Sequence, residues 1–437
     1  MAEGRGAVAI TPEVSRSILV IGGGIAGVSA ALEAAEAGYD VTIVEKNPYL
    51  GGRVAQLARY FPKLCPPYCG LEINFRRIRD NPKIRFHTMA EVDRISGRPG
   101  NFDVSVTLRP RYVNDRCTGC NKCVEVCPAE RPDAFNFGMG KTKAIYLAHE
   151  MAFPMKYAID DTACRLAECA RCVDACAYGA IDLAMTPRAL VLKAGAIVVA
   201  TGWDPYDASR IDNLGFGRHP DVITNVMMER LAAPNGPTRG RILRPSDGKE
   251  VRSAAFVQCA GSRDQNHLGY CSGICCLASL KEATYLRERN PESTAHIFYI
   301  DLRTPGPYEA FQKKVLGDPH VTTTKGKVAR IAVDQATRQL VVEAEDILGA
   351  SKTRVAVDLV VLASGMTPSL GRGAPEGLQG LDADRFVAPG QSGDGIFAAG
   401  CARGPVDVAT SVQDATAAAA LAIESIQAAV LAQGGGR

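Results

Sequence analysis

Two cysteine runs constrain the fold of this chain more than any other feature, because each has a spacing that ferredoxins use to ligate iron–sulfur clusters. The first run reads Cys117-x2-Cys120-x2-Cys123-x3-Cys127-Pro128. The second reads Cys164-x4-Cys169-x2-Cys172-x3-Cys176, with a first gap two residues longer than usual and Ala177 in place of the proline. In bacterial ferredoxins the first three cysteines of a run hold one cluster and the fourth ligates the other.

We therefore expect two [4Fe–4S] clusters with crossed ligands. One cluster would be held by Cys117, Cys120, Cys123 and Cys176. The other would be held by Cys164, Cys169, Cys172 and Cys127. Structural zinc or disulfide bonds are the alternatives, but zinc knuckles rarely show two ferredoxin spacings in tandem.

A dinucleotide-binding fingerprint lies upstream of these cysteines. An apolar run at 17–21 leads into Gly22-x-Gly24-x-x-Gly27, and we expect a helix over 28–37 and a strand over 41–44 that ends at Glu45. The glycines allow a tight turn, close approach of the backbone to a pyrophosphate and close helix–strand packing. The helix N-terminus attracts negative charge, and Glu45 would accept hydrogen bonds from ribose hydroxyls.

The residues after the fingerprint favour FAD over NAD(P)H. Gly51-Gly52-Arg53 resembles the second signature of two-dinucleotide flavoproteins, a stretch that contacts the FAD diphosphate and adenosine. Ala200-Thr201-Gly202 resembles the connection by which such flavoproteins leave and re-enter the FAD domain. The alternatives are a Rossmann unit that binds NAD(P)H and one that binds no nucleotide.

A third group of cysteines lies where a thioredoxin-reductase-like protein would carry its NADPH-binding unit. The strand expected over 254–258 is not followed by a Gly-x-Gly-x-x-Gly motif. The region instead carries Cys259, Cys271, Cys275 and Cys276. Their spacing matches no ordinary ferredoxin rule, so buried cysteines or a thiol pair are alternatives to a third cluster.

The composition is that of a globular chain with room for two or three domains. Of 437 residues, 46% are hydrophobic and 22% are charged, and the net charge is +3. The chain has no dense basic run or basic patch with interleaved aromatic residues, which argues against a nucleic-acid partner. We find no signal peptide, and the apolar run at 415–423 is too short to span a membrane. Fifteen cysteines without an export signal favour a cytoplasmic protein whose thiols bind metal.

Taken together, these motifs resemble the A subunit of heterodisulfide reductase and its relatives. The resemblance includes the CPPYCGLE segment at 65–72, the QCAGSRD…YCSGICC block at 258–276 and the DGIFAAG segment at 394–400. It implies that Cys259, Cys271, Cys275 and Cys276 bind a further, irregularly ligated cluster close to the flavin. Within the family, the chain is most similar to the A subunit of the quinone-interacting membrane-bound oxidoreductase, through 46–54 and 61–72.

The same resemblance implies FAD contacts near the C-terminus. Cys401 follows Gly400 at the position where related flavoproteins usually place an FAD-binding aspartate, and Asp394 lies nearby. Residues 404–408 and the helix expected over 409–429 resemble the element whose N-terminus faces the flavin pyrimidine. No catalytic residue is assigned. The expected cofactor-binding residues are Gly22, Gly24, Gly27, Glu45, Gly51, Gly52, Arg53, Thr201, Gly202, Asp394, Gly400 and Val406.

The expected fold class is α/β. It combines an FAD fold of the thioredoxin or glutathione reductase type, a degenerate second Rossmann-like domain and an inserted bacterial-type ferredoxin module for two [4Fe–4S] clusters. The predicted boundaries give the FAD domain residues 16–109, 186–250 and 351–430, the inserted module residues 110–185, and the degenerate NAD(P)H-type domain residues 251–350.

The expected function is electron relay between FAD and iron–sulfur clusters in a multi-subunit oxidoreductase. The resemblance implies a quinone-linked membrane module and a sulfur-metabolism partner such as adenylylsulfate reductase. The protein would be cytoplasmic, either free or at the inner face of the membrane, which it would contact only through a partner subunit. We further expect a homodimer within the complex.

Three alternatives to this function remain open. They are the A subunit of a sulfur-oxidising or thiol/disulfide complex, with or without electron bifurcation, a stand-alone NAD(P)H-dependent flavin reductase, and a non-enzymatic scaffold with structural clusters. Cys65 and Cys69 form a rigid turn fixed by two prolines, which we favour, a redox dithiol or a contact for a partner.

Overall fold

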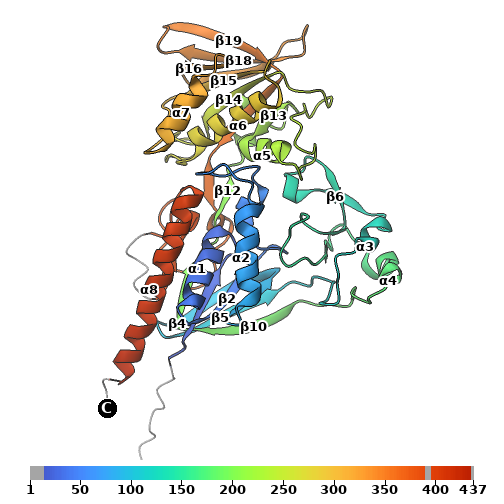
Figure 1. Cartoon of the computed structure of the whole chain (residues 1–437), viewed down its shortest axis with the longest axis vertical. Helices are drawn as coiled ribbons and strands as arrows, with labels where there is room; N and C mark the ends of the chain where they lie inside the picture. The colour runs from blue at the N-terminus through green and yellow to red at the C-terminus, as the bar shows by residue number, and fades with distance from the viewer. Residues whose placement is uncertain (1–13, 389–394, 435–437) are drawn as a thin grey trace, which may run out of the picture.

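A computed structural model of the chain describes residues 14–388 and 395–434. Two parallel sheets form two units that lie one above the other in Figure 1, and a small module of short elements lies beside the lower one. We call the lower unit the first unit, the upper one the second unit, and residues 109–187 the inserted module. This arrangement is the α/β organisation expected from the sequence.

The first unit is built on a five-stranded parallel sheet in the order β22-β11-β1-β2-β3. The strands are β1 (Ser17–Ile21), β2 (Asp40–Glu45), β3 (Ile84–Thr88), β11 (Ala196–Val199) and β22 (Ile396–Ala398). One face packs on α1 (Ile25–Glu36), α2 (Tyr68–Asp80) and α8 (Val408–Gly434). The other face packs on a smaller antiparallel sheet. Since both faces are covered, β1 and β11 are largely apolar, as buried parallel strands usually are.

The inserted module leaves and re-enters the first unit at neighbouring strands. The smaller sheet contains β4 (Ala90–Arg98), β5 (Asn101–Leu108) and β10 (Arg188–Ala194). β5 and β10 are antiparallel, with Leu108 paired to Arg188. The intervening 109–187 therefore begins and ends at one place, which is how a module can be inserted without disturbing its host sheet.

The inserted module has little core of its own. Its elements are β6 (Glu130–Pro132), β7 (Lys141–Lys143), β8 (Ile145–Tyr146), β9 (Ala158–Ile159), α3 (Lys122–Glu125) and α4 (Arg171–Ala175). Its small hydrophobic cluster includes Tyr112, Ile145 and Tyr157, with six cysteines packed against it. A module with so small a core depends on bound metal for its stability.

The second unit is a five-stranded parallel sheet in the order β13-β20-β14-β15-β16. The strands are β13 (Val222–Thr224), β14 (Ser253–Ala260), β15 (Thr294–Tyr299), β16 (Val321–Lys325) and β20 (Leu359–Ser364). One face is covered by α5 (Asn225–Ala232), α6 (Cys275–Arg289) and α7 (Tyr308–Leu316). The other is covered by β17 (Val328–Val333), β18 (Leu340–Asp346) and β19 (Ser351–Val357).

The second unit extends beyond the predicted boundaries of 251–350. β13 and β20 both belong to its sheet, so residues 222–224 and 359–364 lie in this unit rather than in the FAD-type unit. β13 gives little sequence signal because it is three residues long. Two antiparallel connections, β12 (Trp203–Pro205) and β21 (Met366–Pro368), carry the chain between the units.

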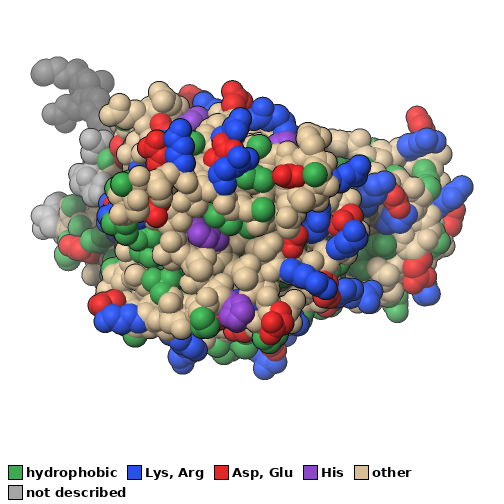
Figure 2. Space-filling model, turned by 90° about the horizontal axis from the view of Figure 1, so that it is seen from above, with side chains coloured by type: hydrophobic (Ala, Val, Ile, Leu, Met, Phe, Trp, Pro, Cys, Tyr) green, Lys and Arg blue, Asp and Glu red, His purple; other side chains and the backbone are tan. Residues whose placement is uncertain are grey.

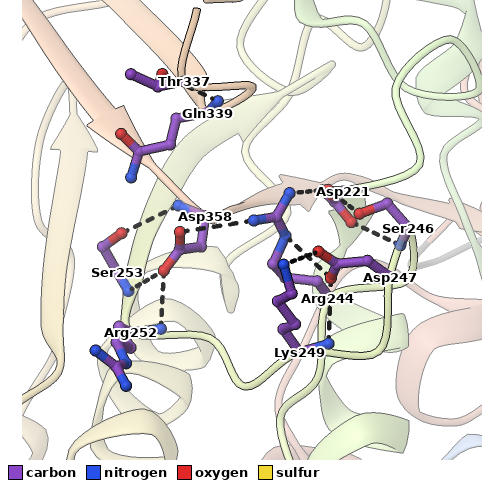
Figure 3. Close-up of polar contacts among 10 residues, drawn as sticks. All are labelled: Asp221, Arg244, Ser246, Asp247, Lys249, Arg252, Ser253, Thr337, Gln339 and Asp358. Atoms are coloured by element: carbon purple, nitrogen blue, oxygen red, sulfur yellow. Dashed lines mark hydrogen bonds and ion pairs between the residues drawn. The ribbon is translucent and has the colours of Figure 1, made fainter.

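A charged cluster fixes the starts of the strands in the second sheet (Figure 3). Arg244 donates from Nη2 to Asp221 at 3.3 Å, and its Nε lies 3.5 Å from Asp247. Asp358 accepts hydrogen bonds from the backbone N–H groups of Arg252 and Ser253. In open α/β sheets, ligands bind at the carboxyl ends of the strands. This cluster lies at the opposite end, so its role is to position the strands.

α8 is longer than expected. It extends from residue 408 to 434, and its segment Val408–Gln433 has the length and mean hydropathy, 1.6, of a helix that could cross a membrane. From the sequence, only the shorter apolar run at 415–423 was expected, and no segment long enough to span a membrane. Ala415, Ala418, Ala422 and Ile426 of α8 are buried in the same hydrophobic cluster as α1, and 28% of the apolar window of α8 is buried. Composition and length alone therefore do not make α8 a membrane span.

Candidate FAD and iron–sulfur sites

A cavity of about 540 Å³ opens at the carboxyl end of the first sheet. Eight of the twelve predicted cofactor-binding residues line it: Gly22, Gly24, Glu45, Gly52, Arg53, Thr201, Gly202 and Val406. Gly27, Gly51 and Gly400 do not line it, and Asp394 lies outside the described residues. The cavity therefore brings together segments from both ends of the chain.

The glycines of the fingerprint have two different roles. One allows the helix to pack closely on the strand, and the other allows a ligand to approach the backbone. A Cβ on Gly27 would lie 1.9 Å from the carbonyl oxygen of Gly22, so Gly27 allows α1 to pack on β1. A Cβ on Gly24 would meet only Gly52 Cα, at 4.0 Å, and would project into open space. Gly24 is also the N-cap of α1, where no side chain caps the free N–H groups. An open helix N-terminus facing a cavity fits the diphosphate of FAD.

Glu45 is the acid at the end of β2, and it is buried. Its carboxylate accepts hydrogen bonds from the Gly23 N–H at 2.6 Å and from the Asn47 N–H at 2.7 Å. Burial raises the pKa of Glu45, although the hydrogen bonds from Asn47 and Gly23 oppose the shift. Asn47 Nδ2 also donates to Oε1 at 2.7 Å, so Oε2, which accepts only from Gly23, retains the lone pair for a ribose hydroxyl.

Arg53 lines the cavity, but it already has protein partners. Its Nη2 forms an ion pair of 2.5 Å with Asp204, and its Nε donates to the carbonyl of Trp203 at 3.2 Å. These partners belong to the connection between the two units. Arg53 therefore fastens that connection to the cavity.

The C-terminal part of the cavity contains a carboxylate that sequence reasoning missed. Cys401 occupies the expected aspartate position and donates from Sγ to the carbonyl of Val406 at 3.5 Å. Burial raises the pKa of Cys401 to about 11, so this thiol is neutral. Asp407 lines the cavity and accepts from the Thr410 N–H at 2.7 Å at the start of α8. An aspartate three residues before a threonine at the start of an apolar helix was the available signal.

The first expected ligand set lies together in the inserted module. Cys117, Cys120, Cys123 and Cys176 line one small cavity with Ile145 and Tyr157. Burial, and then the neighbouring Cys117 thiol, raises the pKa of Cys123 to about 12. The backbone N–H of Ala180 donates to Cys176 Sγ at 3.3 Å, a type of hydrogen bond that also tunes cluster potentials. These four positions fit a cluster, and a bound metal would keep the thiols deprotonated.

The second expected ligand set lies next to the first. Burial, and then the Cys164 thiol, raises the pKa of Cys172 to about 11, and Cys127 and Cys169 act on it in the same direction. The Leu166 N–H donates to Cys164 Sγ at 3.3 Å. All fifteen cysteines of the chain are free, so none of the three groups is a disulfide set.

In the described part of the chain, no three His, Cys, Asp or Glu side chains lie close enough to hold one metal ion. Four thiolates around a cubane stand farther apart than the ligands of one zinc, because the cluster itself occupies the space between them. What favours clusters over zinc is the ferredoxin spacing of the two runs in the inserted module.

The third group of cysteines lies at the carboxyl end of the second sheet. Cys259 lies near the end of β14, Cys271 lies in the following loop, and Cys275 and Cys276 begin α6. Burial raises the pKa of Cys275 well above its ordinary value, and the other three thiols add to the shift. Residues from a strand, a loop and a helix thus form one cluster of thiols. Its position at the start of a helix and the end of a strand fits a cofactor site.

The third group also adjoins the first cavity. A Cβ on Gly273, which lies between Cys271 and Cys275, would be 3.2 Å from the carbonyl oxygen of Pro405. Pro405 directly precedes Val406 and Asp407, which line the cavity. One loop of the second unit therefore contacts the element that closes the first cavity.

The second unit has no nucleotide cradle in its described residues. Residues 261–274 separate β14 from α6, so no tight glycine turn joins strand to helix. Gly261 has a positive φ of 88°, but a Cβ there would lie 2.6 Å from the Tyr206 ring. Tyr206 thus occupies the space above this glycine, where a pyrophosphate would have to approach.

Cys65 lies in a loop that bridges the two units, and Cys69 lies in the first turn of α2. Cys69 is exposed, and the carbonyl of Cys65 accepts from the Tyr60 N–H at 3.1 Å. The neighbouring Phe61 packs edge-on against Tyr308 and Phe311 of α7, with ring centroids 5.1 and 5.3 Å away. The loop thus has a packing role, whatever chemistry the two thiols have.

A buried ion pair joins the units close to this loop. Lys281 of α6 and Glu229 of α5 lie 2.9 Å apart, with side chains 5% and 4% exposed. Lys281 donates to the carbonyl of Arg59 at 2.6 Å, and Glu229 accepts from the Ala58 N–H at 2.9 Å. Both charges of the pair are therefore bound to the backbone of the first unit.

We expect Lys281→Met to destabilise the protein by about 3–5 kcal/mol, because it leaves the Glu229 carboxylate buried without its cation. Urea unfolding followed by circular dichroism measures this change. The control is Lys313→Met, which removes an exposed ion pair with Glu309 and should change stability by less than about 0.5 kcal/mol. Equal effects of the two variants would show that the buried pair does not hold the units together.

Charged side chains do not form a single-sign field on the face drawn in Figure 2. Basic and acidic side chains are interspersed there. That face therefore offers no continuous basic track for a phosphate backbone.

Family models match the two regions that the motifs marked. A model of FAD dependent oxidoreductases matches residues 17–66, and a model of 4Fe-4S binding domains matches residues 110–130. The chain therefore carries the FAD and [4Fe–4S] signatures expected from its sequence.

Curated relatives match nearly the whole chain. It is 39% identical over 424 residues to the iron-sulfur A subunit of the CoB--CoM heterodisulfide reductase of Methanocaldococcus jannaschii, an alignment that covers 93% of this chain and 64% of that protein. It is 39% identical over 429 residues to the A subunit of the Ferredoxin/F(420)H(2)-dependent CoB-CoM heterodisulfide reductase of Methanosarcina acetivorans, covering 94% and 53%. The chain thus spans only about half to two thirds of the length of these relatives.

Solved structures share the fold at low sequence identity. The thioredoxin reductase of T. acidophilum matches with a TM-score of 0.50 and 15% identity, covering 94% of this chain and 99% of that one. The thioredoxin reductase of Lactococcus lactis matches with a TM-score of 0.51 and 13% identity over the same shares. These matches confirm the expected thioredoxin-reductase-like fold.

Proposed function

The chain belongs to the family of heterodisulfide reductase A subunits, and from this premise we propose that it relays electrons between FAD and iron–sulfur clusters within a multi-subunit complex. It is an FAD- and [4Fe–4S]-containing oxidoreductase subunit. FAD supplies the two-electron chemistry, and clusters accept or donate single electrons.

One observation carries the proposal: the cavity that fits FAD adjoins the loop of the third cysteine group and is lined in part by the inserted module, which carries the other two groups. The loop of the third group contacts Pro405 beside the cavity, and the inserted module contributes Phe135 and Tyr146 to the cavity lining. In the proposed assignment the first unit binds FAD, the inserted module binds two clusters through the crossed sets, and the third group binds one more. Electrons would pass between FAD and the third group, and then through the module, or in reverse.

The partners are proposed from the chemistry of such a relay. A protein that converts no substrate must exchange electrons with proteins that do. We propose a quinone-linked module at the membrane and a cytoplasmic enzyme of sulfur metabolism, such as adenylylsulfate reductase. This chain would lie in the cytoplasm, where thiols remain available for metal, and would reach the membrane only through a partner subunit.

We expect the double variant Cys275→Ser/Cys276→Ser to slow electron transfer from FAD to the module clusters by at least about tenfold, because it removes two of the four ligands of the third group. Stopped-flow spectroscopy after rapid photoreduction of FAD measures the rate. Cys69→Ser is the control, since Cys69 is exposed and belongs to none of the three groups. A wild-type rate in the double variant would contradict the relay order.

A stand-alone NAD(P)H-dependent flavin reductase is the weaker candidate. It would need a second nucleotide site, and the Tyr206 ring occupies the space above Gly261 where the nucleotide would approach. Bleaching of the flavin by NADH in the isolated protein would restore this candidate.

A further inference from the structure

The inserted module forms one side of the FAD cavity. Arg131, Asp133, Phe135 and Tyr146 of the module line it together with residues of the first unit. The carbonyl of Phe135 accepts from Gln56 Nε2 at 2.9 Å, and the Phe135 ring lies 5.7 Å from that of Tyr49. The module is thus fastened to the first unit at the cavity itself. Sequence reasoning did not anticipate this contact.

Arg131 is the cation that the module presents to the cavity. Its guanidinium carbon lies 4.0 Å from the centroid of the Tyr146 ring, and its Nε lies 3.3 Å from Asp160. The side chain is 12% exposed. In the described part of the chain, its one hydrogen bond runs from Nη1 to the carbonyl of Pro132 at 3.3 Å. A stacked and paired guanidinium with donors to spare is prepared to bind an anion.

Arg131 lines the cavity together with Glu45 and the stretch after it, on the expected adenosine side. Arg109 and Arg111, where the module begins, donate to the carbonyls of Lys46 and Pro48, at 2.8 and 2.6 Å. These carbonyls belong to the stretch directly after Glu45, the acid that marks the ribose position. Burial raises the pKa of Tyr146, whereas the charges of Arg131, Arg111 and Arg109 lower it. Arg131 and Tyr146 line the same cavity as Lys46, Asn47 and Pro48 of this stretch.

We propose that Arg131 binds the ADP half of FAD, so that the cofactor and the inserted module hold each other in position. The proposal rests on the FAD site described above and extends it to a residue outside the first unit. The diphosphate and ribose oxygens of ADP are acceptors for the free donors of the guanidinium. Because the side chain is already held by Tyr146 and Asp160, little conformational entropy is lost when it binds.

Arg131 and its ion-pair partner Asp160 link the cavity to the cluster ligands. The carbonyl of Asp160 accepts from the Cys164 N–H at 3.0 Å, and Cys127 lies four residues before Arg131. Cys127 and Cys164 belong to one expected ligand set. If FAD binding orders Arg131, it also orders the loop that carries Cys127 and Cys164. By reciprocity, a module that contains its clusters should bind FAD more tightly.

The test compares Arg131→Ala with the wild type in flavin-depleted protein whose iron content is verified. FAD and ADP dissociation constants are measured by titration. We expect both to weaken by about tenfold or more, as for the loss of a charged hydrogen bond. Lys141→Ala is the matched control, because Lys141 lies on β7 of the same module and is 76% exposed. Its two dissociation constants should stay within about twofold of the wild type.

Two further variants separate ligand binding from support of the module. Arg131→Lys keeps the charge, so at full iron content it should bind FAD and ADP more tightly than Arg131→Ala. It also allows the test to be made if the alanine variant does not take up its full iron content. Asp160→Asn should weaken ADP less than Arg131→Ala does. Wild-type ADP affinity in Arg131→Ala, or an equal loss in Asp160→Asn, would overturn the proposal. Neither result would bear on the relay, which the cysteine double variant tests.

Discussion

Gly27→Ala is expected to prevent normal folding of the first unit and with it all FAD binding. The added Cβ would lie 1.9 Å from the Gly22 oxygen and 3.0 Å from the Gly22 carbonyl carbon, both in the backbone. Neither atom can move without separating α1 from β1, so we expect a loss of more than about 3 kcal/mol. Thermal unfolding followed by circular dichroism, together with the FAD content after purification, measures the effect.

Gly24→Ala is the matched comparison for this prediction. Gly24 has an ordinary φ of −73°, and its added Cβ would meet only Gly52 Cα at 4.0 Å, so the variant should fold. It should still bind FAD poorly, because the methyl group enters the space through which the backbone approaches the diphosphate. A Gly27→Ala protein with wild-type stability and FAD content would refute the account of the fingerprint.

Substitutions of the cysteine ligands in the inserted module should fall into two classes, one for each cluster. Each class should contain cysteines from both runs. Cys127→Ser should lose the same cluster as Cys164→Ser, and Cys176→Ser the same cluster as Cys117→Ser. The structure supports this expectation, because Cys176 lines one cavity with Cys117, Cys120 and Cys123, whereas Cys127 does not. Each variant should lose about four irons per chain.

Low-temperature electron paramagnetic resonance of the reduced variants, with iron analysis, would assign each variant to a class. Cys69→Ser should retain the full iron content, since Cys69 belongs to no group of four. If Cys127→Ser instead lost the cluster of Cys117, the crossed arrangement would be wrong.

The sequence predicted the parts of the fold that depend on strong local patterns. β1 spans Ser17–Ile21 as expected, because an apolar run before a glycine turn has few alternatives. The strand expected over 254–258 is the centre of β14. The cysteine spacings likewise identified which thiols the structure brings together in the module.

The missed features depend on contacts between distant segments. The boundary of the second unit was placed too narrowly because β13 and β20 join its sheet from outside 251–350. The contribution of Arg131 to the cavity could not be predicted, since nothing local relates it to a fingerprint about one hundred residues upstream. Asp407 carried a capping signal, but only the folded chain places it beside the cavity.

The central claim is that FAD and three clusters occupy this one chain. The most direct test measures iron, acid-labile sulfide and FAD per polypeptide in protein purified without oxygen. The account predicts about twelve irons per FAD, which requires a cluster at Cys259, Cys271, Cys275 and Cys276 as well as two in the inserted module. About eight irons per FAD would contradict it, because clusters would then be confined to the module and the third group would be free thiols.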